Sequence, residues 1–216
     1  MAIAYDSYGT SNGGSNITIT LPSDDNLAVL LVWHYEDAGA GAGGPPTVPS
    51  GATATLVTTA DFFRGARSYI VTGLSSGSNT FGFPRSGGNQ MALAIVMTGV
   101  DQTTPVEDAT LTDTSYSSGQ VITMDTDDSD ELGIIVIGSP TSNVTVAGTS
   151  GTTYGGKSAV GSYGGTLDFG YEATAGTTVG LALTKTGGSH QAIGYSFNPS
   201  TGGGAEPLNN KIMSVV

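Results

Sequence analysis

The chain has 216 residues, no cysteine, and a formal net charge of −12 from six Lys and Arg against 18 Asp and Glu. This length suits one all-β domain with a sizeable core. The charge disfavours binding to nucleic acid or to an anionic membrane, because no basic stripe is present to neutralise phosphates. Without cysteine the chain has no disulfide, thiolate metal site or cysteine nucleophile, so packing and backbone pairing must hold the fold.

Segments rich in β-branched and aromatic residues alternate with Gly, Ser, Asn and Asp clusters, and helical periodicity is almost absent. This pattern is typical of a sandwich or barrel. The expected strands, in chain order, are residues 3–8, 16–21, 27–35, 54–63, 67–72, 79–83, 91–99, 120–124, 132–137, 143–147, 166–171, 178–183 and 191–197. We therefore predict an all-β fold, a jelly-roll-like antiparallel sandwich of two sheets with about 13 strands.

Two kinds of strand differ in their pattern of apolar residues. Leu27–Trp33, Met91–Met97 and Leu132–Ile137 are continuously apolar, which predicts burial on both faces and a central position. Asn16–Leu21 and Asn143–Val146 alternate between apolar and polar residues, which predicts outer or edge strands with their threonines facing water.

The domain organisation follows from the loops and the end of the chain. Residues 37–51 and 101–119 are expected to be long loops. Residues 1–199 are predicted to form the sandwich domain, and residues 200–216 a Gly-rich linker with an apolar tail, Leu208–Val216. A free apolar tail is an aggregation liability. We expect it either to fold back as a final strand or to dock onto a neighbouring subunit.

Two glycine motifs and two histidines are the features that an enzyme would use. Gly39–Gly44 matches GxGxxG but continues into prolines and not a helix, and Gly73–Gly77 matches GxSxG but continues into a predicted strand. His34 and His190 each stand alone and are interpreted as polar caps of strands. We expect no catalytic residues and no enzymatic activity; a Ser/His/Asp site assembled from distant loops is the alternative.

The densest carboxylate cluster runs from Asp125 to Glu131. Calcium takes several such oxygen ligands, but the spacing of an EF-hand fails, since Asp130 stands where Gly is needed and Val136 where the bidentate Glu is needed. The alternative is an acidic connection between two strands. Beyond this candidate calcium site no cofactor is expected. Its candidate ligands are Asp125, Asp127, Asp128 and Asp130.

The run Gly99-Val100-Asp101-Gln102-Thr103-Thr104-Pro105-Val106 follows an apolar strand and resembles a motif of jelly-roll-like β-sandwich modules. Such modules occur in phage structural proteins and bacterial surface proteins. The order of features is also similar over about residues 15–199, and it closes with Ala192–Pro199. The resemblance implies a fold and defines no catalytic residues. Where the family often has an aromatic and Gly-Gly turn, this chain has Pro45–Pro49.

A composition low in charge, with no sign of a signal peptide at residues 1–9, fits a protein made in the cytoplasm and exposed only after assembly and lysis. We expect a phage virion protein, a capsid decoration or cement protein located in the virion that stabilises the shell through its termini. The expected partners are the major capsid protein or other virion subunits, including further copies in a homo-oligomer. The expected partner-binding residues are Ile3, Tyr5, Leu208, Ile212, Met213 and Val215.

The alternative function is a carbohydrate-binding or adhesive module of a phage tail or a bacterial surface. It would use Tyr154, Tyr163 or the acidic loop Asp125–Asp130, because amphipathic rings stack on sugars and a groove lined by them would select a glycan.

Overall fold

The structure is a computed structural model, and it describes residues 3–13, 16–24, 26–35, 44–58, 67–84, 90–114, 121–125, 131–139, 144–148, 153–159, 166–172, 178–185 and 190–201. The strands of the first half are β1 Ala4–Asn12, β2 Asn16–Leu21, β3 Ala28–Tyr35, β4 Thr53–Thr58, β5 Arg67–Thr72, β6 Gly77–Gly82 and β7 Gln90–Thr98. Those of the second half are β8 Val106–Thr114, β9 Val121–Asp125, β10 Leu132–Ser139, β11 Val144–Gly148, β12 Thr153–Ala159, β13 Thr166–Glu172, β14 Thr178–Lys185 and β15 His190–Phe197. Within these ranges, no helix is long and apolar enough to cross a membrane.

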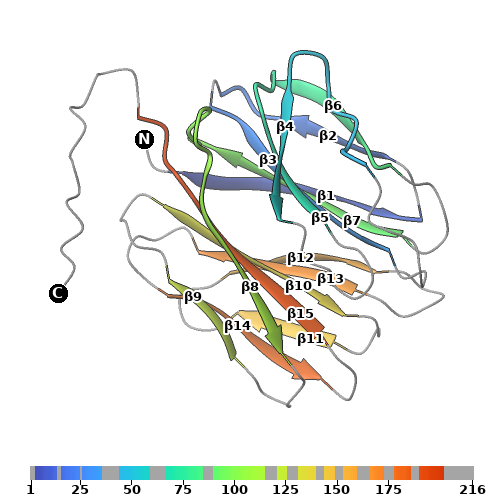
Figure 1. Ribbon diagram of the computed structural model, residues 1–216, viewed down its shortest axis with the longest axis vertical. Helices are drawn as coiled ribbons and strands as arrows, with labels where there is room; N and C mark the ends of the chain where they lie inside the picture. Colours follow the sequence, from blue (N-terminus) through green and yellow to red (C-terminus); the bar gives the residue numbers. More distant parts are fainter. Residues whose placement is uncertain are drawn as a thin grey trace.

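Two five-stranded antiparallel sheets form the centre of the molecule, in the orders β1-β7-β3-β5-β4 and β12-β13-β10-β15-β8. The prediction of an all-β antiparallel sandwich is confirmed. A two-stranded sheet, β2-β6, accompanies the first sheet, and a three-stranded sheet, β11-β14-β9, lies against β10, β13 and β15 of the second. In Figure 1 the blue-to-green strands of the first half lie above the yellow-to-red strands of the second half.

The predicted central strands are β3, β7 and β10, and their continuous apolar runs are explained by burial on both faces. In β3, Leu30 and Val32 belong to the core between the two large sheets. Val29 and Leu31 belong to a second core beneath the β2-β6 sheet. The predicted outer strand, β2, is confirmed as well, since it exposes Thr18 and lies outside the large sheets.

Two strands contradict the sequence prediction. Residues 106–114 were expected within a loop, yet they form β8, an edge strand paired with β15. Residues 153–159 were not expected to form a strand, yet they form β12, which pairs with β13. β8 carries Glu107, Asp108 and Asp113, and β12 contains Gly155 and Gly156; these residue types are depleted in strands and favour turns.

The two halves of the chain share one topology. The large sheet of the first half runs β1-β7-β3-β5-β4, and the large sheet of the second half, counted from its β8 edge, runs β8-β15-β10-β13-β12. The β2-β6 pair corresponds to β9-β14, beside which β11 is an addition. Residues 1–199 therefore contain two equivalent β-modules, which bury their large sheets against each other in one core.

The irregularities of the two modules coincide. Against their neighbours, β1 and β8 each skip one residue, Asp6 and Glu107, and β4 and β12 each skip one residue, Val57 and Gly155. Each bulge thus occurs at the same place in both modules, so the registers equate individual residues. The equivalent pairs used below are Tyr5 with Val106, Tyr8 with Ala109, Thr55 with Thr153, Ser68 with Phe169, Ile70 with Tyr171 and Ile95 with Tyr195.

Candidate functional site

The motif that carries the family resemblance, Gly99–Val106, joins the two modules, and its glutamine holds three segments together. Gln102 donates from Nε2 to the carbonyl oxygens of Leu27, at 3.2 Å, and Val100, at 2.9 Å. Its Oε1 accepts a hydrogen bond from the backbone N–H of Gly73 at 3.0 Å. The polar groups of this side chain are thereby engaged in structure.

The same junction anchors the chain after β15. The Ser200 N–H donates to the Gly99 carbonyl at 2.7 Å, and the Asp101 N–H donates to the Asn198 carbonyl at 2.9 Å. The Asn198 N–H donates in turn to the Pro105 carbonyl at 3.1 Å. The chain therefore leaves the second module directly beside the start of β8.

One side of the sandwich, where β1 lies beside β12, is sealed by aromatic rings and is called the tyrosine edge. Tyr5 stacks on Tyr171 with 4.1 Å between the ring centroids, and Tyr8 meets Phe169 edge-on at 5.2 Å. The Tyr8 ring lies over Gly156, where an added Cβ would come within 2.8 Å of Tyr8 Cε1. Glycine in β12 is what allows the ring to approach the strand.

The predicted N-terminal contact residues lie at this edge. Ile3 is 4% exposed and belongs to the core between the modules, while Tyr5 packs against that core and against the second module. Burial raises the pKa of Tyr5 to about 12, helped by the nearby Tyr171, Tyr8 and Asp6. In this structure both side chains contact the chain itself, and their contact with a partner stays a prediction.

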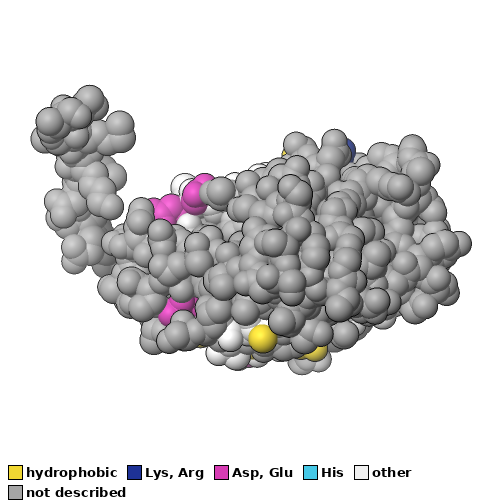
Figure 2. Space-filling model, turned by 90° about the horizontal axis from the view of Figure 1, so that it is seen from below, with side chains coloured by type: hydrophobic (Ala, Val, Ile, Leu, Met, Phe, Trp, Pro, Cys, Tyr) yellow, Lys and Arg dark blue, Asp and Glu magenta, His cyan; other side chains and the backbone are white. Residues whose placement is uncertain are grey.

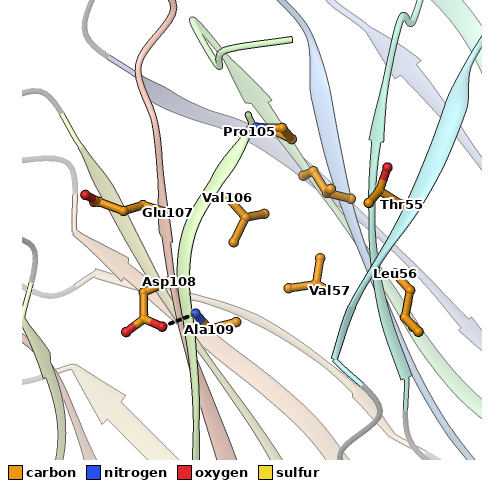
Figure 3. Close-up of a pocket in the computed structure, with 9 residues that line it drawn as sticks. Thr55, Leu56, Val57, Pro105, Val106, Glu107, Asp108 and Ala109 are labelled. Atoms are coloured by element: carbon orange, nitrogen blue, oxygen red, sulfur yellow. Dashed lines mark hydrogen bonds between the residues drawn. The ribbon is translucent and has the colours of Figure 1, made fainter. Parts of the chain in front are cut away.

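The opposite side, where β4 lies beside β8, is the open edge, and it contains a pocket of about 360 Å³. Val57 and Val106 point toward each other across it, whereas Glu107 and Asp108 point away from β4 (Figure 3). The Asp108 Oδ1 accepts a hydrogen bond from the Ala109 N–H at 2.7 Å. The lining residues are Thr55, Leu56, Val57, Ile70, Pro105, Val106, Glu107, Asp108 and Ala109.

The pocket exists because the open edge has smaller side chains than the tyrosine edge. Val106, Ala109 and Ile70 occupy the places that Tyr5, Tyr8 and Tyr171 occupy at the other side. Each replacement removes an aromatic ring. An apolar cavity of about 150 Å³ is large enough to bind benzene, so the pocket has room for about two rings. It has no room for all three, because Val57 and Thr58 stand in β4 where β12 has Gly155 and Gly156.

Part of the aromatic volume is recovered deeper in the core. Ser68 stands where the tyrosine edge has Phe169, but the fully buried Tyr195 stands where it has Ile95. Burial raises the pKa of Tyr195 far above its ordinary value, and the neighbouring Ser68 hydroxyl opposes this shift. The interior of the open edge is thus packed, and side-chain volume is missing only nearer the surface, beside Val106 and Ala109.

The candidate cation site is only partly described. Asp125 is the last residue of β9, whereas Asp127, Asp128 and Asp130 lie outside the described residues. Among the side chains that the structure describes, no group of three or more His, Cys, Asp or Glu is arranged to hold a metal ion. The calcium site stays a prediction, as do the contacts of Leu208, Ile212, Met213 and Val215, which also lie outside the described ranges.

Among the features considered for catalysis and for glycan binding, His34, Tyr154 and His190 lie in strands. Gly73–Gly77 leads from β5 into β6, a strand and not a helix, as the sequence predicts. His34 lies near the end of β3 and His190 begins β15, which agrees with their interpretation as residues at strand ends. Tyr154 lies in β12, and Tyr163 and most of the GxGxxG segment are outside the described residues.

The described surface is acidic and has few apolar side chains. Asp6, Glu107 and Asp108 are exposed, and the large hydrophobic side chains exposed among the described residues are Tyr8 and Leu56. On the face shown in Figure 2, magenta acidic side chains stand out and the yellow hydrophobic atoms are scattered. The open-edge pocket is of mixed character, because six of its nine lining residues are apolar and the other three are Thr55, Glu107 and Asp108.

Comparisons with known proteins assign no family. No family model matches the chain, and no curated protein and no solved structure matches it.

Proposed function

We propose that this chain is a non-enzymatic structural protein of a bacteriophage virion, a capsid decoration or cement protein. The observation that carries the proposal is the open-edge pocket. Six of its nine lining residues have apolar side chains, and the two carboxylates on β8 point away from β4 (Figure 3). Such a pocket can hold apolar side chains of another protein but brings no acid–base pair to a substrate.

The sequence supports the virion as the location. Only 11% of the residues are charged, and most of the polarity comes from Ser, Thr, Asn and Gly, as is usual for extracellular and virion surfaces. The motif Gly99–Val106 resembles modules of phage structural proteins. In the structure its Gln102 binds the first module at Leu27, and its backbone binds the end of the second module at Asn198 and Ser200.

The mechanism is stabilisation by binding. The partners are the major capsid protein or other virion subunits, including further copies of this chain. A protein that binds the assembled shell and not the free subunits favours assembly by mass action, by about 2.7 kcal/mol per site at a free concentration one hundred times the dissociation constant. The two modules share one core, so they would bind a partner as a single unit.

The test is binding to undecorated capsids, measured by co-sedimentation together with light scattering on the free protein. A variant ending at Thr201 is the comparison, because it keeps the Ser200 hydrogen bond to Gly99. We expect the full chain to bind and the shortened chain to lose binding while keeping its melting temperature. A full chain that stays monomeric and ignores capsids contradicts the proposal and favours a ligand-binding module.

A further inference from the structure

We propose that the open-edge pocket binds the apolar C-terminal segment, Leu208–Val216, of a second copy of this chain. The inference rests on the proposed function, because it names the surface through which copies associate. It differs from that function in its test, which needs no capsid.

The first argument is the shape of the pocket. At the tyrosine edge the same backbone arrangement, with the same bulges, accommodates the rings of Tyr5 and Tyr8 between its strands. At the open edge the equivalent positions are Val106 and Ala109, and about 360 Å³ remains. This space remains although Val57 and Thr58 stand in β4 where β12 has Gly155 and Gly156, so the side chains that fill it would come from another segment.

The second argument is chemical complementarity. The segment carries Leu208, Ile212 and Met213, followed by two valines, which match the aliphatic walls formed by Val57 and Val106. It also carries one cation, Lys211, and β8 carries the exposed carboxylates Glu107 and Asp108 on the side away from β4 (Figure 3). A positive charge near β8 is favourable in a chain whose net charge is −12.

The third argument concerns the direction of the chain and selects a second copy. β15 runs antiparallel to β8, so Gln191 lies opposite Asp113 and Phe197 opposite Val106. The chain consequently passes along the pocket and leaves at its Pro105 end, heading away from it. Entry into its own pocket would require a reversal within residues 202–207, whereas onward extension carries the segment to a neighbour. Two copies exchanging segments would form a closed two-fold dimer.

The experiment uses the absence of native cysteine. A full-length variant with Thr55→Cys and Met213→Cys places one thiol on the β4 wall of the pocket and one in the segment. The matched control is Thr153→Cys with Met213→Cys, because Thr153 is the equivalent exposed threonine at the tyrosine edge. Both proteins are oxidised at low concentration and analysed by non-reducing electrophoresis and mass spectrometry.

We expect most of the Thr55 variant to become a disulfide-linked dimer, with at least a fivefold lower yield from the control. An intramolecular disulfide in a monomer overturns the assignment to a second copy, and equal yields from both variants overturn the pocket. If the protein binds capsids but no cross-linked dimer forms, the interface proposed here is wrong and the proposed function stands. If the dimer forms but the protein does not bind capsids, the interface stands and the proposed function is wrong.

A second variant tests the space itself. Ala109→Tyr combined with Thr58→Gly restores both the ring that Tyr8 supplies at the other edge and the glycine, Gly156, that makes room for it. We expect this double variant to fill the pocket and to shift full-length protein from dimer to monomer in light scattering. Unchanged dimerisation in a stably folded double variant contradicts the proposal, and so does loss of dimerisation in Thr58→Gly alone, because that variant leaves the pocket open.

Discussion

The contact between Gly155 and Phe169 allows a sharp test of the tyrosine edge. A Cβ added at Gly155 would come within 2.7 Å of Phe169 Cδ2 and still closer to Cε2 and Cζ. The ring cannot simply move away, because Tyr5 and Tyr8 lie against it with centroids at 6.0 and 5.2 Å. Gly155→Ala should therefore destabilise the protein by about 1–3 kcal/mol, the usual cost of overpacking.

The reciprocal change removes the ring. Phe169 is fully buried, so Phe169→Ala should cost about 3–5 kcal/mol through lost burial and a cavity. In the double variant the new Cβ occupies space that the ring has left. The two changes should therefore cost about 1–2 kcal/mol less together than the sum of the single costs, within the range found for residues in contact.

The assay is urea unfolding of the three variants and of a control, Gly44→Ala. An added Cβ at Gly44 meets nothing within 4 Å, so this variant should remain within about 0.5 kcal/mol of the wild type. The packing of β12 under the aromatic rings would be refuted if Gly155→Ala were as mild as Gly44→Ala. Additivity of the single costs in the double variant would refute it as well.

Two further predictions concern named side chains. The neutral form of Tyr5 is favoured in the folded state, so its contribution to the free energy of unfolding is complete below pH 10 and is lost between pH 10 and about 12. Over this range the free energy of unfolding of the wild type should fall by roughly 1 kcal/mol more than that of Tyr5→Phe, a value reduced for solvent screening of a partly exposed ring. Urea unfolding at increasing pH checks this, and parallel curves for the two proteins would contradict it. Gln102→Ala should cost about 1–3 kcal/mol, because the Leu27 and Val100 carbonyls lose a donor. Gln102→Glu also lacks the donating amide and should have a melting temperature no higher than that of Gln102→Ala. A Gln102→Glu protein with the melting temperature of the wild type would refute the role of the amide.

The sequence predicted those parts of the fold in which one pattern determines the outcome. Leu27–Trp33 is apolar throughout because β3 faces a core on each side, so its central position was readable. β8 was not recognised from the sequence, because it begins directly after Pro105 and carries Glu107, Asp108 and Asp113, residue types that are typical of turns and loops. The sequence of β12 resembled a loop because it contains Gly155 and Gly156. Glycine is needed at both positions because the rings of Phe169 in β13 and Tyr8 in β1 lie against them.

The pocket could not have been predicted from the sequence, since it depends on which residues of one module face which residues of the other. The duplication of the module was the signal that could have led to it. Its equivalent pairs, such as Tyr5 with Val106 and Leu31 with Ile135, have unequal separations because the connecting loops differ in length. A search for one fixed period therefore misses it, and strand register was needed to align the modules.

The open edge can be interpreted by comparing it with the tyrosine edge. They share strand order, bulge position and a neighbouring core, so a difference between them comes from side chains and not from the backbone. At the tyrosine edge the chain supplies its own rings, which fix one module against the other. At the open edge the same backbone has Val106 and Ala109, although it accommodates rings elsewhere. Apolar side chains left open at this edge are best explained by a segment that arrives after folding, and every copy contains such a segment in Leu208–Val216.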